Sequence, residues 1–183
     1  NSDERLSPAS MTKIMTMLLI MEALEDGKIQ WNEKVRTSEY AASMGGSQVF
    51  LEEGEEMTVD ELLRAISISS ANDASVAMAE RIAGSEKQFV KMMNQKAKEL
   101  GLKDTKFQNA TGLPAKNHYS SARDMAILAK ELLKHEKITN YTSQYESYLR
   151  EGTDKKFWLV NTNRLVKFYP GVDGLKTGFT KEA

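Results

Sequence analysis

The segment from Ser10 to Glu25, which reads SMTKIMTMLLIMEALE, restricts the fold of this chain more than any other. If it forms a helix, apolar side chains cover almost every face of that helix, and the Asp26-Gly27 pair that follows is typical of a helix end. A helix that is apolar on all sides is stable in water only when other elements cover it. The sequence therefore predicts a central helix that is buried nearly all round.

Helix start signals predict further helices around this one. Thr58 and Glu61 have the spacing of a capping box ahead of LLRAISI, which predicts a helix to about Ser69. Ser85 and Gln88 repeat that spacing. Three more helices are expected over residues 73–84, 85–101 and 121–134.

Strand signals are concentrated near the end of the chain. Residues 156–160, KFWLV, alternate in polarity and are rich in strand-forming residues, and residues 174–180, GLKTGFT, follow a Pro170-Gly171 turn. Residues 28–57 mix short extended pieces such as KVRTS with a Gly45-Gly46 turn. There is no repeat or low-complexity stretch. The sequence therefore predicts a single α+β domain over residues 1–183, with strands at the edge of a helical mass.

The composition excludes several classes of function. The chain has 25 Lys and Arg against 26 Asp and Glu, so no net field favours nucleic acid or an anionic membrane surface. There is no cysteine, which excludes disulfides and thiolate metal sites, and the only histidines, His118 and His135, are expected at the surface and not in a metal site. No run approaches the ~18 apolar residues of a membrane span. No signal segment opens the chain, so we expect Asn1 to be an internal start.

Three short motifs with catalytic residue types follow one another along the chain. They are Ser10-x-x-Lys13, Ser70-x-Asn72 between two predicted helices, and Lys176-Thr177-Gly178 on a predicted strand. Lys13 lies one helical turn after Ser10, which places its amine within reach of the hydroxyl. A serine hydroxyl is a poor nucleophile until a base takes its proton, and no motif contains a histidine. We expect Lys13 to be that base if burial and the like charge of Lys176 lower its pKa.

Each motif also has a purely structural interpretation. Ser10 fits a helix N-cap followed by a solvated Lys13, and Ser70 and Asn72 fit loop and cap residues. Residues 176–178 fit a strand end with a turn glycine. All three structural interpretations must hold together for a catalytic one to fail, so we favour the catalytic one.

The three motifs together resemble those of class A β-lactamases and penicillin-binding proteins. The stretches SPASMTKIMT, SSANDASVAMAE, MMNQKAKELGLKDTKFQNATGL and VDGLKTGFT resemble the low-molecular-weight D-alanyl-D-alanine carboxypeptidases over nearly the whole chain. The resemblance implies the α+β fold of the β-lactamase and DD-peptidase group. In that fold a helical cluster packs on an antiparallel sheet, of which residues 1–183 would hold only a part, and the site lies between the helices and the sheet edge.

The resemblance also implies a role for each motif residue. Ser10 would be the acylated nucleophile, and Lys13 would be its base. Ser70 would relay a proton to the departing D-alanine, and Asn72 would hold the substrate amide.

The third motif would bind the substrate. Lys176 and Thr177 would meet its terminal carboxylate, Gly178 would leave room for it against the strand, and Arg164 is a further candidate for the carboxylate. The oxyanion would lie between the backbone N–H groups of Ser10 and Phe179. No cofactor or metal is implied.

The implied function is that of a serine DD-carboxypeptidase acting on peptidoglycan. It would remove the C-terminal D-alanine from pentapeptide stems through an acyl-enzyme on Ser10, and β-lactams would trap that intermediate. Such an enzyme works outside the cytoplasm, on the outer face of the membrane, in the periplasm or secreted, and contributes to cell shape. Membrane association would depend only on segments outside this chain.

Two alternatives remain. A class A-like β-lactamase needs a glutamate in an E-x-x-x-N pattern, which Glu136 and Asn140 provide, but far later in the chain than such a loop would follow the second motif. A non-catalytic peptidoglycan-binding member is disfavoured by the intact Ser10, Lys13 and Lys176. We also expect residues 1–183 to be a truncated catalytic domain that is not active alone, because two strands without further packing are marginal in water.

Overall fold

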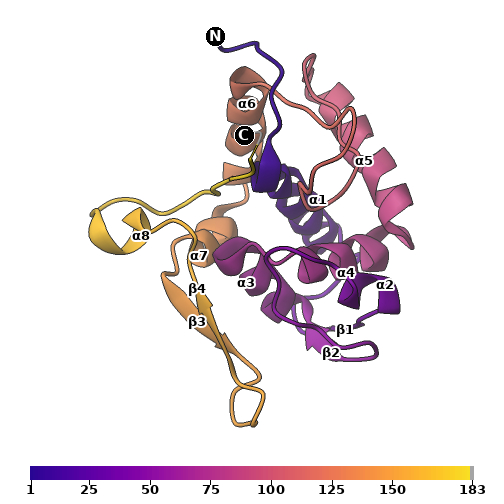
Figure 1. The fold of residues 1–183 in the computed structure, drawn as a ribbon, viewed down its shortest axis with the longest axis vertical. Coiled ribbons are helices and arrows are strands. Elements are labelled where there is room, and N and C mark those ends of the chain that lie inside the picture. The colour runs from indigo at the N-terminus through magenta and orange to yellow at the C-terminus, as the bar shows by residue number, and fades with distance from the viewer. Residues whose placement is uncertain (182–183) are drawn as a thin grey trace.

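The computed structural model describes residues 1–181 and shows a helical cluster with two small antiparallel sheets. Helix α1 (Lys13–Glu25) runs through the centre, and four helices of 11 to 14 residues surround it (Figure 1). These are α3 (Val59–Ser69), α4 (Asn72–Ala83), α5 (Glu86–Glu99) and α6 (Ala122–Leu133). Shorter helical elements are η1 (Ala9–Thr12), α2 (Glu39–Ala42), η2 (Glu136–Ile138), α7 (Thr139–Thr142) and α8 (Leu165–Phe168). No helix among the described residues is long and apolar enough to cross a membrane.

Helix α1 is buried as its composition predicts. Every residue from Lys13 to Met21 is buried, and so is Ala23. The prediction placed the helix start at Ser10, whereas residues 9–12 form a separate 3₁₀ turn and the α-helix begins at Lys13. No side chain caps either element, so the N-cap interpretation of Ser10 is wrong.

The surrounding helices begin where their caps predict. Thr58 Oγ1 accepts from the Glu61 N–H at 3.1 Å, and Glu61 Oε2 accepts from the Thr58 N–H at 2.8 Å, which completes the predicted capping box. Ser85 Oγ accepts from the Gln88 N–H at 3.1 Å. Within residues 1–181 the reciprocal bond from Gln88 is not formed, so only half of that box is confirmed.

One short sheet is formed by strands in the first third of the sequence, and the other by strands near its end. Strand β1 (Lys34–Arg36) pairs with β2 (Glu56–Thr58), and β3 (Glu146–Leu149) pairs with β4 (Phe157–Val160), both antiparallel. The KFWLV prediction is confirmed by β4. The β3–β4 hairpin projects from the helical body (Figure 1).

The prediction of a strand over residues 174–180 is wrong, because the structure shows no strand there. Residues 172–180 run without regular secondary structure and return to the beginning of α1 (Figure 1). A strand needs a backbone partner, and within residues 1–181 β4 pairs only with β3. Side chains hold the segment instead, since Thr142 Oγ1 donates to the Asp173 carbonyl at 2.7 Å and Asn163 Nδ2 donates to the Gly174 carbonyl at 3.1 Å.

Both histidines are less exposed than the sequence predicts. His118 is 7% exposed, and its Nδ1 accepts from the Gln108 N–H at 2.9 Å. Nε2 therefore carries the proton and donates to Thr12 Oγ1 at 2.8 Å. Burial lowers the pKa of His118 to about 4. The His135 side chain is 11% exposed and contacts Glu25.

The buried His118 predicts an acid-sensitive fold. Its folded pKa of about 4 lies below the ordinary 6.5, so the contribution of His118 to stability is fully present above pH 6.5 and is lost as the pH drops from 6.5 to about 4. The full loss from this group is about 3 kcal/mol. His118→Asn keeps an acceptor but no titrating ring, and urea unfolding at several pH values should show a flatter dependence for it over this range. Equal slopes for the two proteins would show that His118 does not set the acid limit.

Candidate active site

The three sequence motifs meet at the beginning of α1. Ser10 lies in the η1 turn, and Asn72 opens α4, with its Oδ1 2.7 Å from Lys13 Nζ. The third motif lies against the same turn, because a Cβ on Gly178 would stand 3.0 Å from the Pro8 carbonyl oxygen and 3.3 Å from the Met11 nitrogen. Segments far apart in the sequence therefore form one site.

Lys13 is the centre of this site. Its side chain is fully buried, and Nζ lies 2.7 Å from Asn72 Oδ1, 2.8 Å from the Thr111 carbonyl oxygen and 3.3 Å from Ser10 Oγ. Burial lowers the pKa of Lys13 well below its ordinary value, and the positive charge of Lys176 lowers it further. The negative charge of Asp73 acts in the opposite direction. Burial and the charge of Lys176 thus both lower the pKa of Lys13, which is what the sequence analysis required of a lysine base.

An ammonium at Lys13 could donate to all three neighbouring oxygens, and a neutral amine can be accommodated by the same contacts. A neutral amine has two N–H groups and one lone pair. The two short contacts, to Asn72 and Thr111, use both N–H groups. The remaining direction faces Ser10 Oγ at 3.3 Å, where the lone pair can accept the hydroxyl proton.

Asn72 is held in one orientation. Its Nδ2 donates to the Gly45 carbonyl at 2.8 Å, and its backbone N–H donates to the Ser47 carbonyl at 2.7 Å. Because Oδ1 faces Lys13, the amide can meet a substrate only through its second Oδ1 lone pair or its second Nδ2 hydrogen.

Ser70 stands apart from this hydrogen-bond network. It follows α3 in the left-handed conformation, with φ 57° and ψ 37°, and is 3% exposed. Its Oγ has no hydrogen-bond partner within the described chain. A left-handed non-glycine residue and an unpaired buried hydroxyl each cost ~1–3 kcal/mol, a combination that is typical of functional sites.

Lys176, the charged residue of the third motif, is partly buried. Burial lowers the pKa of Lys176 to about 8, and its Nζ donates to the Thr177 carbonyl at 2.9 Å. The hydroxyl of Thr177 lies 2.7 Å from that of Thr162. The Phe179 side chain is 86% exposed. Arg164 is exposed beside α8, and within residues 1–181 its side chain makes no ion pair.

The sequence analysis missed the loop of residues 109–113. Asn109 Oδ1 accepts from the Gly112 N–H at 2.8 Å and from the Thr111 N–H at 3.2 Å, which sets the loop that offers the Thr111 carbonyl to Lys13. Gly112 has φ 86°, and a Cβ there would lie 1.9 Å from the Ala9 carbonyl oxygen. The turn-forming Asn and Gly of NATGL were a signal for a tight loop, but not for its contact with Lys13.

An apolar groove of about 470 Å³ lies beside the third motif. Met11, Ile14 and Lys176 are among its lining residues, together with Met125 and Ala129 of α6. Apolar surface of this kind in a folded domain is normally covered by another element or by a ligand.

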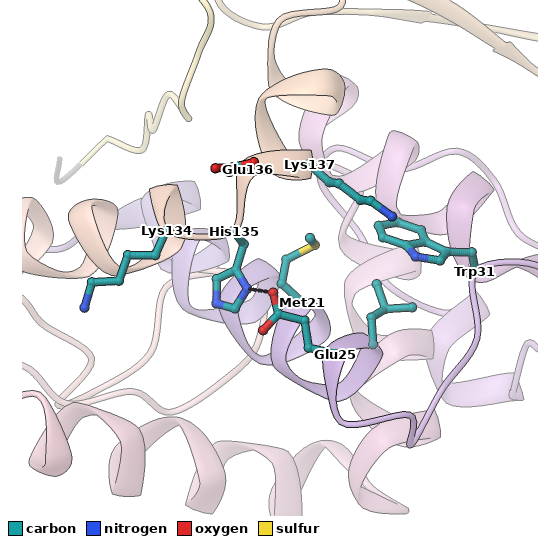
Figure 2. A pocket seen from close by; sticks show the side chains of 8 residues that line it. Met21, Glu25, Trp31, Lys134, His135, Glu136 and Lys137 are labelled. Atoms are coloured by element: carbon teal, nitrogen blue, oxygen red, sulfur yellow. Dashed lines mark hydrogen bonds and ion pairs between the residues drawn. The ribbon is translucent and has the colours of Figure 1, made fainter.

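A second pocket, of about 390 Å³, lies at the other end of α1 (Figure 2). There His135 Nδ1 lies 2.7 Å from Glu25 Oε1, and Glu136 lies nearby (Figure 2). Helix α1 separates this end from Lys13 by ~18 Å at 1.5 Å per residue. Glu136 therefore lies too far away to activate a water at Ser10, so it is not the glutamate that the β-lactamase alternative requires. Residues 1–181 contain no group of three or more side chains that could hold a metal ion.

Comparisons with known proteins show the family of this chain. A family model described as D-alanyl-D-alanine carboxypeptidase matches residues 1–183. The chain is 75% identical over 183 residues to the D-alanyl-D-alanine carboxypeptidase DacF of Bacillus subtilis, covering 100% of this chain and 47% of that protein. The chain thus spans about half the length of the curated relatives it matches.

Solved structures show the same fold. Penicillin binding protein 5 from Haemophilus influenzae has a TM-score of 0.90 at 36% identity, covering 98% of this chain and 52% of that one. Penicillin-binding protein D2 from Listeria monocytogenes, in a cefotaxime-bound form, has a TM-score of 0.85 at 33% identity, covering 100% of this chain and 73% of that one. The α+β prediction is confirmed, and by its whole-length family match the chain belongs to the D-alanyl-D-alanine carboxypeptidase family, peptidase family S11.

Proposed function

We propose that the protein containing this chain is a serine DD-carboxypeptidase that removes the C-terminal D-alanine from the pentapeptide stems of peptidoglycan. The observation that carries this proposal is the buried amine of Lys13, held by Asn72 and Thr111 with its remaining direction towards Ser10. A lysine placed in this way can act as a base near neutral pH. Family membership supplies the substrate class.

In the proposed acylation step, Ser10 Oγ attacks the carbonyl carbon of the penultimate D-alanine while its proton moves to Lys13. The carbon–nitrogen bond then breaks, and the departing D-alanine amine takes the proton held by Lys13 through Ser70, whose buried hydroxyl has no partner in the described chain. Water hydrolyses the ester in a second step and regenerates Ser10. With a β-lactam the same attack opens the ring, and the leaving nitrogen stays attached to the acyl group.

The remaining motif residues would bind and polarise the substrate. Lys176 and Thr177 would meet the terminal carboxylate, and Asn72 would contact the substrate amide. Backbone N–H groups of Ser10 and Phe179 would stabilise the oxyanion, and such a donor is commonly worth ~3–4 kcal/mol of barrier. Because a backbone group does this work, the exposed Phe179 ring has no part in it.

The location of the substrate implies the location of the enzyme. Peptidoglycan lies outside the cytoplasm, so a protein that trims it acts there. We place the enzyme on the outer face of the cytoplasmic membrane, in the periplasm or among secreted proteins, and assign any membrane association to segments outside residues 1–183.

Penicillin should add one covalent equivalent to the protein at Ser10, because Ser10 is the hydroxyl that faces the buried amine. Intact-protein mass spectrometry should show the adduct, and Ser10→Ala should abolish it while leaving the fold intact. Ser70→Ala is the matched control, and it should slow labelling without moving the label. A label mapped to Ser70, or an adduct on Ser10→Ala, would refute the assignment.

Acylation should rise with pH through an apparent pKa well below the ~10.4 of free lysine. Lys176→Ala removes a like charge, so it should raise the pKa of Lys13 and move this limb to higher pH. Lys176→Arg keeps the charge and should leave the limb near its original position. The apparent value belongs to the coupled pair. An identical pH profile for Lys176→Ala would show that Lys176 does not tune Lys13.

We also propose that further strands complete the catalytic domain. The support is the apolar groove beside Lys176 and the segment of residues 172–179, which forms no strand among the described residues. Uncovered apolar surface favours aggregation. A longer chain that includes neighbouring segments should react faster with penicillin and unfold more sharply on heating than residues 1–183. Equal rates and equally sharp transitions would show that these residues are sufficient.

A further inference from the structure

Asp73 is a buried carboxylate directly after the second motif. It is fully buried in the first turn of α4. Its oxygens accept from the Val49 N–H at 3.2 Å, from the Leu51 N–H at 3.0 Å and from its neighbour Ala74 at 2.9 Å. A buried charge needs such donors, and here two of them come from a distant loop.

The loop bound by Asp73 is the loop that holds Asn72. Residues 45–51 have no regular secondary structure, and they accept from Asn72 at Gly45 and Ser47 at 2.8 and 2.7 Å. A Cβ on Gly46 would lie 2.8 Å from Asn72 Nδ2, so the loop also packs closely on the amide. Two adjacent residues of α4 thus fix two parts of one loop.

The backbone of this loop is bent towards Asp73. Phe50 lies between the two residues that donate to the carboxylate and has φ 57°, which costs a non-glycine residue ~1–3 kcal/mol. Its side chain is 62% exposed, so burial of the ring does not offset that cost. The bonds to Asp73 stabilise this conformation on the inner side, and Arg150 donates to the Val49 and Phe50 carbonyls on the outer side.

We propose that Asp73 is a positioning residue of the site, which fastens the loop of residues 45–51 around Asn72 and supplies a fixed negative charge that opposes Lys176 at Lys13. The first role keeps Asn72 Oδ1 at the amine. The second keeps the amine from losing its proton too readily, since a base that is too weak transfers protons poorly.

The electrostatic role depends on few groups. Lys176 and Asp73 are the charges that act on Lys13, and His118, whose ring contacts the adjacent Thr12, is neutral near pH 7. Most other charged side chains on α1 and on the helices packed against it are either exposed or paired elsewhere. Lys87, Lys91, Lys98 and Lys130 are exposed. The paired ones are Arg64 with Asp60, Lys96 with Glu22, Arg81 with Glu33, Arg123 with Asp3, His135 with Glu25, and Glu80 and Asp124 with hydroxyl groups.

The test compares Asp73→Asn with Asp124→Asn in the full-length protein. Asp124 is also a buried carboxylate in the first turn of a helix that accepts from a loop, but it does not act on Lys13. With ¹³Cε-labelled lysine, NMR should show the Lys13 midpoint moved to lower pH by roughly half a unit or more in Asp73→Asn. Asp124→Asn should leave it unchanged, and Lys13→Met assigns the signal.

A second readout, the penicillin acylation rate, rests on the proposed function. It should fall at least about tenfold in Asp73→Asn, and also in Asp73→Glu, which keeps the charge but displaces the oxygens. In Asp73→Glu the Lys13 midpoint should stay near that of the unmodified protein. If the unmodified protein does not react with penicillin but the midpoint still moves, the proposed function fails and the charge role of Asp73 stands.

The proposal is overturned if Asp73→Asn matches Asp124→Asn in both midpoint and rate. If neither Asp73 variant folds, amide hydrogen exchange of the unmodified protein decides the loop role. The Val49 and Leu51 N–H groups should be protected as strongly as the Asn72 N–H. Rapid exchange at Val49 and Leu51 would overturn the proposal.

Discussion

Lys13 brings an amine into the interior of a helical cluster, and the surrounding structure is arranged to accommodate it there. A charged ammonium loses its hydration in such a place, so burial favours the neutral form. A neutral amine still requires acceptors for its N–H groups, and Asn72 and the Thr111 carbonyl provide them. The one direction left leads to Ser10. The burial that makes a charged Lys13 costly therefore also favours the neutral form that a base requires.

The acceptors and charges around Lys13 lie at helix ends and in irregular loops. Asn72 begins α4, Thr111 belongs to the loop organised by Asn109, and Lys176 lies in a segment held by side chains. Loops carry function most effectively when a rigid scaffold fixes their ends. Here the scaffold is α1 and its neighbours, and the bonds within each loop are made mainly by Asn, Asp and Thr side chains.

The pocket at the far end of α1 shows why a sequence pattern needs a position in space. Glu136 and Asn140 have the spacing expected of a β-lactamase glutamate and asparagine. Yet Glu136 lies in the pocket with Glu25 and His135 (Figure 2), at the opposite end of α1 from Ser10. The same residue types at the same spacing cannot share a reaction centre across ~18 Å of packed helix.

The features that the sequence determined by itself are those whose interactions lie within a few residues. The apolar faces of α1, the cap at Thr58 and the spacing of Ser10 and Lys13 depend on one or two helical turns, so local chemistry encodes them. Family resemblance brought the three motifs together without showing their contacts.

Only the tertiary structure decided the partners that lie far along the chain. It placed the Thr111 carbonyl beside the Lys13 amine and buried His118 against Thr12. It also gave residues 172–180 an irregular conformation, although the sequence predicted a strand over residues 174–180. No local pattern specifies these contacts, because each depends on which distant segments of the chain come together in the fold. A side chain can suit a strand or a surface position, but the neighbouring residues in space determine whether that residue lies in a strand or at the surface.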